Sequence, residues 1–143
     1  MAHKDAGNYG AKHGSGSSLN RSIAQAVGKR AAKGEITCAN AFAVADEVHV
    51  PPAEVGVSID LLEIRINKCQ LGLFGYGSKK IVVKPANISA ELSKAIFDAL
   101  VNGRLPCMLA WEIAERFDVP KMDVSSACEA LKIKIKPCQL GAF

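Results

Sequence analysis

The residues of this chain whose types and spacing could support chemistry are first of all its cysteines. Cys38 and Cys69 are 31 residues apart, and so are Cys107 and Cys138, whereas Cys128 lies outside this pattern. Two pairs of thiols could form disulfides, or together a zinc or iron–sulfur site with four thiolates. However, no Cys-x-x-Cys is present, and cysteines with apolar neighbours are typical of a packed core. Core burial is the favoured interpretation, and a metal or redox role stays open.

Lysines form the second group, because ammonium groups bind phosphate. Lys132, Lys134 and Lys136 recur at every second residue, and on a strand they would point to the same side. Such a row predicts either a phosphate-binding track or an ordinary solvated face, and both interpretations are kept. Further candidates for nucleic-acid contact are Lys68, Lys79, Lys80, Lys121, Ser125 and Ser126.

Patterns typical of enzymes are missing from the sequence. Its three histidines are scattered at His3, His13 and His49, and it has neither a phosphate-loop glycine pattern nor a Ser-His-Asp order. We therefore expect no enzymatic activity, no cofactor and no small-molecule substrate.

The elements that must position these residues occur twice. Cys69-Gln70-Leu71-Gly72 returns 69 residues later, at 138–141, and each copy is followed two residues after its glycine by a phenylalanine. Residues 34–74 match residues 103–143 without a gap, with 15 of 41 positions identical. The chain is therefore two copies of one unit, each near the lower size limit for an independent core.

Each copy is predicted to contain three helices. Apolar residues at four-residue spacing predict a helix over 19–33 and its counterpart over 88–100, with Ser89 as N-cap. Two more helices are predicted in each copy after a short extended piece, and a proline separates them. Their ranges are 38–48 and 52–62 in the first copy, and 107–117 and 121–131 in the second.

A strand is predicted after the third helix of each copy. Apolar and basic residues alternate in Ile64-Arg65-Ile66 and in Ile133-Lys134-Ile135, as in a half-buried strand. In the first copy a glycine-rich turn and a returning strand at 81–83 would complete a hairpin. Residues 1–18, rich in glycine and serine, are expected to form a flexible arm.

This order of elements resembles the winged-helix form of the helix-turn-helix. The likeness rests on the alanine-rich helix at 38–48, the turn Val50-Pro51-Pro52, the helix after it and the predicted hairpin. It implies a mostly α fold with small β hairpins, built of two tandem winged-helix-like units at 19–85 and 86–143. It also implies that the third helix enters the major groove of DNA and that the wing contacts the backbone.

The charges favour some of these contacts over others. The third helix of the first unit has no Lys or Arg and carries Glu54 and Asp60, so it suits base reading poorly. That of the second unit offers Lys121, Ser125 and Ser126. Residues 1–84 hold 11 Lys or Arg against 7 Asp or Glu, and residues 85–143 hold seven of each. We therefore expect the first half to meet a polyanion more readily.

We accordingly expect a cytoplasmic protein that binds nucleic acid, double-stranded DNA above all, and acts as a transcriptional regulator. No apolar run reaches the roughly 20 residues that span a bilayer, so no membrane contact is expected. Two alternatives stay open. One is a protein-interaction module on the same scaffold, binding another protein or a second copy of the chain. The other is a metal or redox sensor that uses Cys38, Cys69, Cys107 and Cys138.

Overall fold

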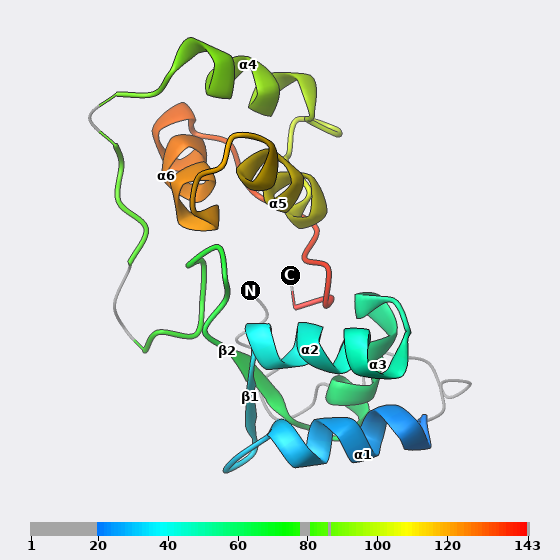
Figure 1. Cartoon of the computed structure of the whole chain (residues 1–143). Coiled ribbons are helices and arrows are strands. Elements are labelled where there is room, and N and C mark those ends of the chain that lie inside the picture. Colours follow the sequence, from blue (N-terminus) through cyan, green and yellow to red (C-terminus); the bar gives the residue numbers. More distant parts are fainter. Residues whose placement is uncertain (1–19, 78–80, 86, 143) are drawn as a thin grey trace. The chain divides into compact units, whose positions relative to one another are not determined.

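The computed structural model of the chain describes residues 20–77, 81–85 and 87–142. These residues form six helices and one small sheet of two strands (Figure 1), so the predicted mostly helical fold with little β structure is confirmed. They divide into two units. Unit 1 is the described part of Met1–Cys69 together with that of Gln139–Phe143, and unit 2 is Gln70–Cys138 with the same restriction.

Unit 1 contains three helices and both strands. Helix α1 (Arg21–Arg30) is followed by strand β1 (Glu35–Thr37), helix α2 (Cys38–Val48), helix α3 (Pro52–Leu61) and strand β2 (Arg65–Asn67). Side chains fix two of the helix starts. Asn20 Oδ1 accepts the N–H of Ile23 at 3.1 Å, and Thr37 Oγ1 accepts that of Asn40 at 3.1 Å. Its core includes Ile23, Val27, Ile36, Val44, Val55 and Ile59.

Unit 2 contains the other three helices. Helix α4 (Ala90–Asp98) precedes helix α5 (Cys107–Arg116) and helix α6 (Lys121–Leu131). The predicted cap Ser89 is confirmed, because its Oγ accepts the N–H of Leu92 at 3.1 Å. No helix in the described part of the chain is long and apolar enough to cross a membrane.

The backbone repeats at the same offset of 69 residues as the sequence. His49 and its counterpart Asp118 both have positive φ, at 57° and 54°, and so do Glu63 and Lys132, at 56° and 59°. The parallel register of β1 and β2 pairs Ile36 with Ile66, and an isolated parallel bridge in unit 2 pairs the corresponding residues 105 and 135. Both copies therefore fold the same way locally.

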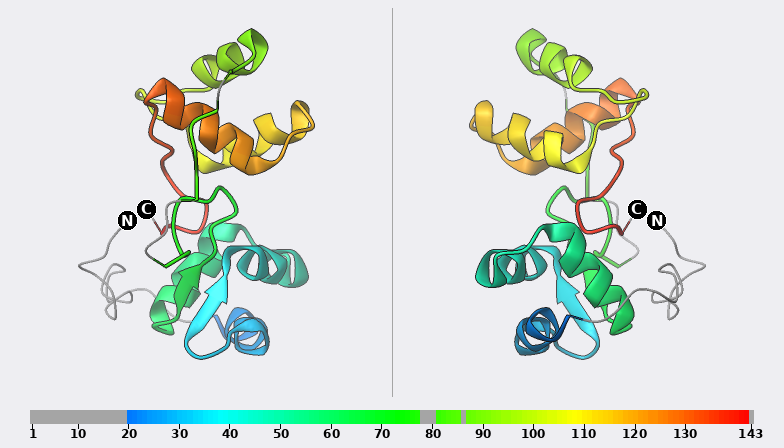
Figure 2. Two further views of the ribbon diagram at one scale, coloured as in Figure 1. Left: turned by 90° about the vertical axis from the view of Figure 1, so that its left-hand side faces the viewer. Right: turned by 90° about the vertical axis from the view of Figure 1, so that its right-hand side faces the viewer.

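The small sheet differs from the predicted hairpin. Strands β1 and β2 run parallel and lie side by side (Figure 2) because α2 and α3 carry the chain back over to the start of β1. Residues 81–83 form no strand, so the expected returning strand is wrong. Val82 of this segment is instead buried in unit 2, where its Cγ2 lies 3.0 Å from a Cβ built at Gly72.

Each copy of Cys-Gln-Leu-Gly is the place where the chain passes from one unit to the other. Unit 1 ends at Cys69 and resumes at Gln139, and unit 2 extends from Gln70 to Cys138. The boundary therefore lies at residue 69 rather than at residue 85, and the last residues of the chain belong to unit 1. We call 69–72 and 138–141 the crossing segments.

The crossing segments are anchored by buried leucines. Leu140 is 2% exposed, and its backbone lies directly on α3, where a Cβ at Gly56 would be 2.7 Å from the Leu140 carbonyl carbon. In unit 2 Leu71 is fully buried, and a Cβ at Gly72 would lie 3.0 Å from Met122 Cε of α6. Each repeat is thus completed by the segment that follows the third helix of the other repeat.

Candidate nucleic-acid interface

Four basic residues lie around the end of α6 and the parallel bridge between Leu105 and Ile135 in unit 2. Leu105 N donates to Lys134 O at 3.0 Å, and Lys136 N donates to Leu105 O at 2.8 Å. Leu105 and Ile135 are buried, so the flanking residues face outward. We define the basic edge as the exposed residues Arg104, Lys132, Lys134 and Lys136.

Lys132 belongs to this edge for a reason other than strand alternation. It is the C-cap of α6 in the left-handed conformation, with φ of 59°, so the predicted regular row of three lysines on one strand is not formed. Lys134 and Lys136 do alternate around Ile135. Among the described residues, no ion pair involves any of these three lysines or Arg104.

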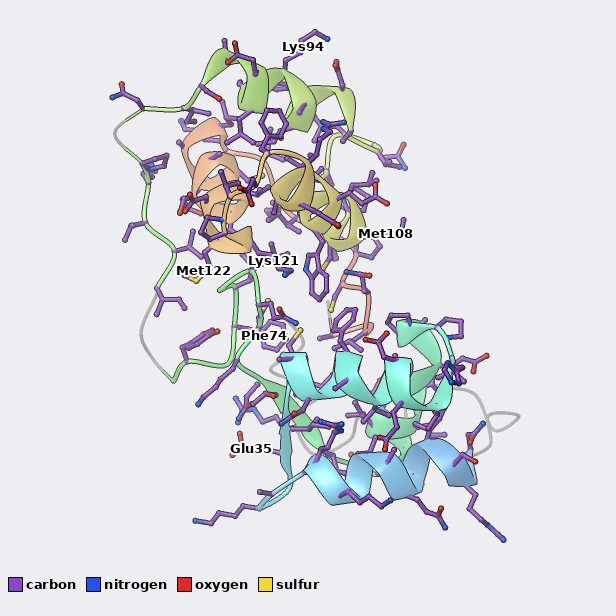
Figure 3. The ribbon with its side chains drawn as sticks, viewed as in Figure 1. Glu35, Phe74, Lys94, Met108, Lys121 and Met122 are labelled. Atoms are coloured by element: carbon purple, nitrogen blue, oxygen red, sulfur yellow. The ribbon has the colours of Figure 1, made fainter. Side chains whose placement is uncertain are left out.

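Unit 1 carries a different set of charges at the matching positions. Glu35 and Arg65 are opposite each other in the register, and Glu35 Oε2 also accepts Asn67 Nδ2 at 2.7 Å (Glu35 is labelled in Figure 3). The counterparts of these three residues in unit 2 are Arg104, Lys134 and Lys136. A complementary pair in unit 1 is therefore a like-charged pair in unit 2.

Like charges directly opposite each other on paired strands are destabilising. This cost is offset when an anion lies against them. Arg104 was not among the residues that the sequence singled out. Aligning the two repeats would have found it, because it replaces an acidic residue of the first copy.

The other predicted contacts of unit 2 are less accessible. Lys121 Nζ lies 4.6 Å from the centre of the Trp111 ring, a cation–π contact at the start of α6 (Figure 3). Ser125 is only 2% exposed, since it takes the place of Gly56 on the covered side of the helix, so it cannot contact DNA from this position. Ser126 is half-buried and lines a pocket of about 300 Å³ with Asp123.

The predicted contacts around the first wing are divided between the units. Lys68 is exposed in unit 1, at a positive φ of 47°. Lys79 and Lys80 lie outside the described residues. The sequence of unit 2 holds ten Lys or Arg against seven Asp or Glu, and that of unit 1 holds eight against seven. The excess of positive charge is therefore in unit 2, contrary to the expectation from the two halves of the sequence.

The cysteine pairs are brought together as the repeat suggested. Thr37 pairs with Asn67, so Cys38 and Cys69 follow adjacent strand ends, and Cys107 N donates to the carbonyl of Pro137, next to Cys138, at 3.0 Å. Four of the five thiols are buried, and Cys138 is half-buried. Among the described residues, no three His, Cys, Asp or Glu side chains form a group that could hold a metal ion.

Unit 2 also exposes large apolar side chains at positions where the described part of unit 1 has small residues. Phe97, Val101 and Met108 are 52%, 53% and 53% exposed, and we call them the apolar patch. The matching residues of unit 1 are Gly28, Ala32 and Ala39. The two units thus differ in surface while sharing a fold.

Comparisons of this chain with protein-family models, curated proteins and solved structures found no match. The most informative comparison is internal, between the two units of one chain.

Proposed function

We propose that this protein binds double-stranded DNA, with the basic edge of unit 2 contacting phosphates. The observation that carries the proposal is the change from Glu35 and Arg65 in unit 1 to Arg104 and Lys134 in unit 2. In unit 1 the same backbone carries the oppositely charged residues Glu35 and Arg65 at these positions. The fold therefore does not require four cations at the basic edge, and their presence is particular to the sequence of unit 2. A polyanion is the ligand that repays their mutual repulsion.

The order of α5 and α6 supports DNA as the polyanion. Two helices separated by the turn Asp118–Pro120 follow the helix-turn-helix pattern, and we propose that the chain is a tandem variant of the winged-helix type acting as a transcriptional regulator. The three lysines of the basic edge directly follow α6, so phosphate contacts there would guide the helix toward a groove. Since the exposed side of α6 offers neither Arg nor Asn for bidentate base contacts, we expect weak sequence preference.

A salt titration of binding to a labelled duplex tests the proposal. The double variant Lys134→Ala/Lys136→Ala should bind more weakly than the wild type, and the slope of log affinity against log salt should fall by about two. Arg65→Ala, at the position of Lys134 in unit 1, is the matched control and should leave the slope nearly unchanged. Equal slopes for the wild type and the double variant would rule out the basic edge as the interface.

The apolar patch favours a second candidate, a role in protein interaction. Exposed Phe97 and Met108 are large apolar residues at positions where the first repeat keeps small ones. For a second copy of the chain as partner, the wild type should sediment as a dimer, and Phe97→Gly/Met108→Ala, which restores the residues of unit 1, should sediment as a monomer. A monomeric wild type at high concentration would contradict self-association.

A further inference from the structure

An open pocket of about 370 Å³ lies between α4 and α5 in unit 2. It is lined by the apolar residues Ala95, Ala99, Leu109 and Ile113 and by the charged residues Asp98, Glu112 and Arg116. A volume of this size suits a small molecule.

The matching space in unit 1 is occupied by a side chain of the protein itself. Arg30 of α1 reaches across to α2, where its Nη1 donates to Asn40 Oδ1 at 3.4 Å and its Nε lies 3.8 Å from Glu47 Oε2. Both interactions join the two helices. The Arg30 side chain therefore fills the gap that remains open in unit 2.

All three partners are replaced in unit 2. Arg30 corresponds to Ala99, Asn40 to Leu109 and Glu47 to Arg116. Unit 2 therefore has no long side chain at the position of Arg30 and no side-chain hydrogen-bond acceptor at that of Asn40. At the position of Glu47 it has a guanidinium in place of a carboxylate. Unit 2 thus has an open pocket here, lined by both apolar and charged residues, with Arg116 where unit 1 has Glu47.

The charges of the pocket are available to a ligand. Glu112 and Arg116 are four residues apart on α5, yet among the described residues neither has an ion-pair partner. Arg116 lies with its guanidinium carbon 5.4 Å from the centre of the Phe117 ring, which limits its orientations. Asp98 is already engaged, since its Oδ2 accepts Lys94 Nζ at 2.7 Å. Glu112 and Arg116 are therefore the opposite charges of the lining that have no ion-pair partner in the described part of the chain, beside Asp98 with its partner Lys94.

We propose that this pocket binds an apolar α-amino acid. The carboxylate of the ligand would pair with Arg116, its ammonium with Glu112, and its side chain would rest on Leu109 and Ile113 in place of the missing arginine stem. A zwitterion matches both charges at once, whereas a simple carboxylic acid or amine matches one and meets repulsion from the other. The proposal stands independently of DNA binding.

Thermal unfolding and calorimetric titration of the full chain test it, without nucleic acid present. L-leucine or L-phenylalanine at about 10 mM, high enough for a weak small ligand, should raise the unfolding midpoint by a few degrees. The analogues 4-methylpentanoate, which lacks the ammonium, and 3-methylbutylamine, which lacks the carboxylate, should bind at least about tenfold more weakly than leucine, because each loses one charge pair.

Two variants place the binding in this pocket. Ala99→Arg restores the side chain found in unit 1 and should abolish leucine binding, and Arg116→Gln, an exposed and conservative change, should weaken it at least about tenfold. Arg30→Ala is the matched control in unit 1 and should bind leucine like the wild type. Absence of any response to both amino acids, or an undiminished response in Arg116→Gln, would overturn the proposal.

Discussion

The buried thiol of Cys128 is a single group whose behaviour the fold changes strongly. It is 1% exposed in the core of unit 2, and burial raises its pKa from 9.0 to about 11. The folded chain keeps this proton above pH 9, where the unfolded chain loses it. Its contribution to stability is therefore complete below pH 9 and is lost as the pH rises through 11, by at most about 3 kcal/mol.

A comparison of the wild type with Cys128→Ala measures this effect. At pH 8 the variant should be less stable, because it leaves a cavity in the core. At about pH 10.5 the difference in the free energy of urea unfolding should shrink, because only the wild type has lost the contribution of the thiol. A difference that is the same at both pH values would contradict the assigned burial effect.

The identity of Gly56 decides whether the C-terminal crossing segment can lie on α3. An alanine Cβ there would overlap the Leu140 carbonyl group, so Gly56→Ala should destabilise the protein by about 1–3 kcal/mol despite a better helix propensity. Gly28→Ala is the matched control in α1, where an added Cβ meets nothing within 4 Å, and should stabilise by about 0.5–1 kcal/mol. Thermal unfolding checks both, and equal stability of the two variants would show that Leu140 does not occupy this position.

Helices were the elements that the sequence predicted best. The ranges predicted for α2 and α6 agree with the structure, and those of the other helices differ by a few residues at their ends. Four-residue apolar spacing, side-chain caps such as Ser89, and prolines at helix starts are local signals, so one sequence suffices to read them.

The crossing segments could not be predicted in this way. Alternation at Ile64–Ile66 indicates a strand but not its partner, since parallel pairing with β1 depends on residues about thirty positions away. Burial of Leu71 and Leu140 in one unit or the other likewise depends on contacts that no local pattern reports. The sequence predicted that the residues after Cys69 form the wing of the first repeat, whereas in the structure they belong to unit 2.

The candidate site was predicted in part. Lys132, Lys134 and Lys136 were found because equal residues recur at a fixed spacing. Ser125 was wrongly predicted to be accessible, because the sequence of α6 does not show which side of the helix is covered in the folded unit. Arg104 was missed because its importance lies in a change of charge from Glu35 between the aligned repeats, and not in a motif or a spacing of its own.

The whole molecule is a duplicated unit whose copies have diverged in surface chemistry. Unit 2 carries the basic edge, the apolar patch and the open pocket, whereas unit 1 has a neutralised edge, small residues and an arginine that fills the matching space. Because both units share one backbone pattern, each feature of unit 2 has a control in unit 1. We infer that unit 2 makes the functional contacts and that unit 1 is chiefly structural.

Exchanging the charges of the two edges and measuring duplex DNA affinity at about 50 mM salt shows whether the basic edge binds DNA. Arg104→Glu gives unit 2 the acidic residue of unit 1, and Glu35→Arg does the reverse. We predict that Arg104→Glu weakens binding at least about tenfold, because it neutralises Lys134 and repels phosphate, while Glu35→Arg binds as well as the wild type or better. Equal affinity of Arg104→Glu and the wild type, or no duplex binding by the wild type, would show that the basic edge is not a DNA-binding surface.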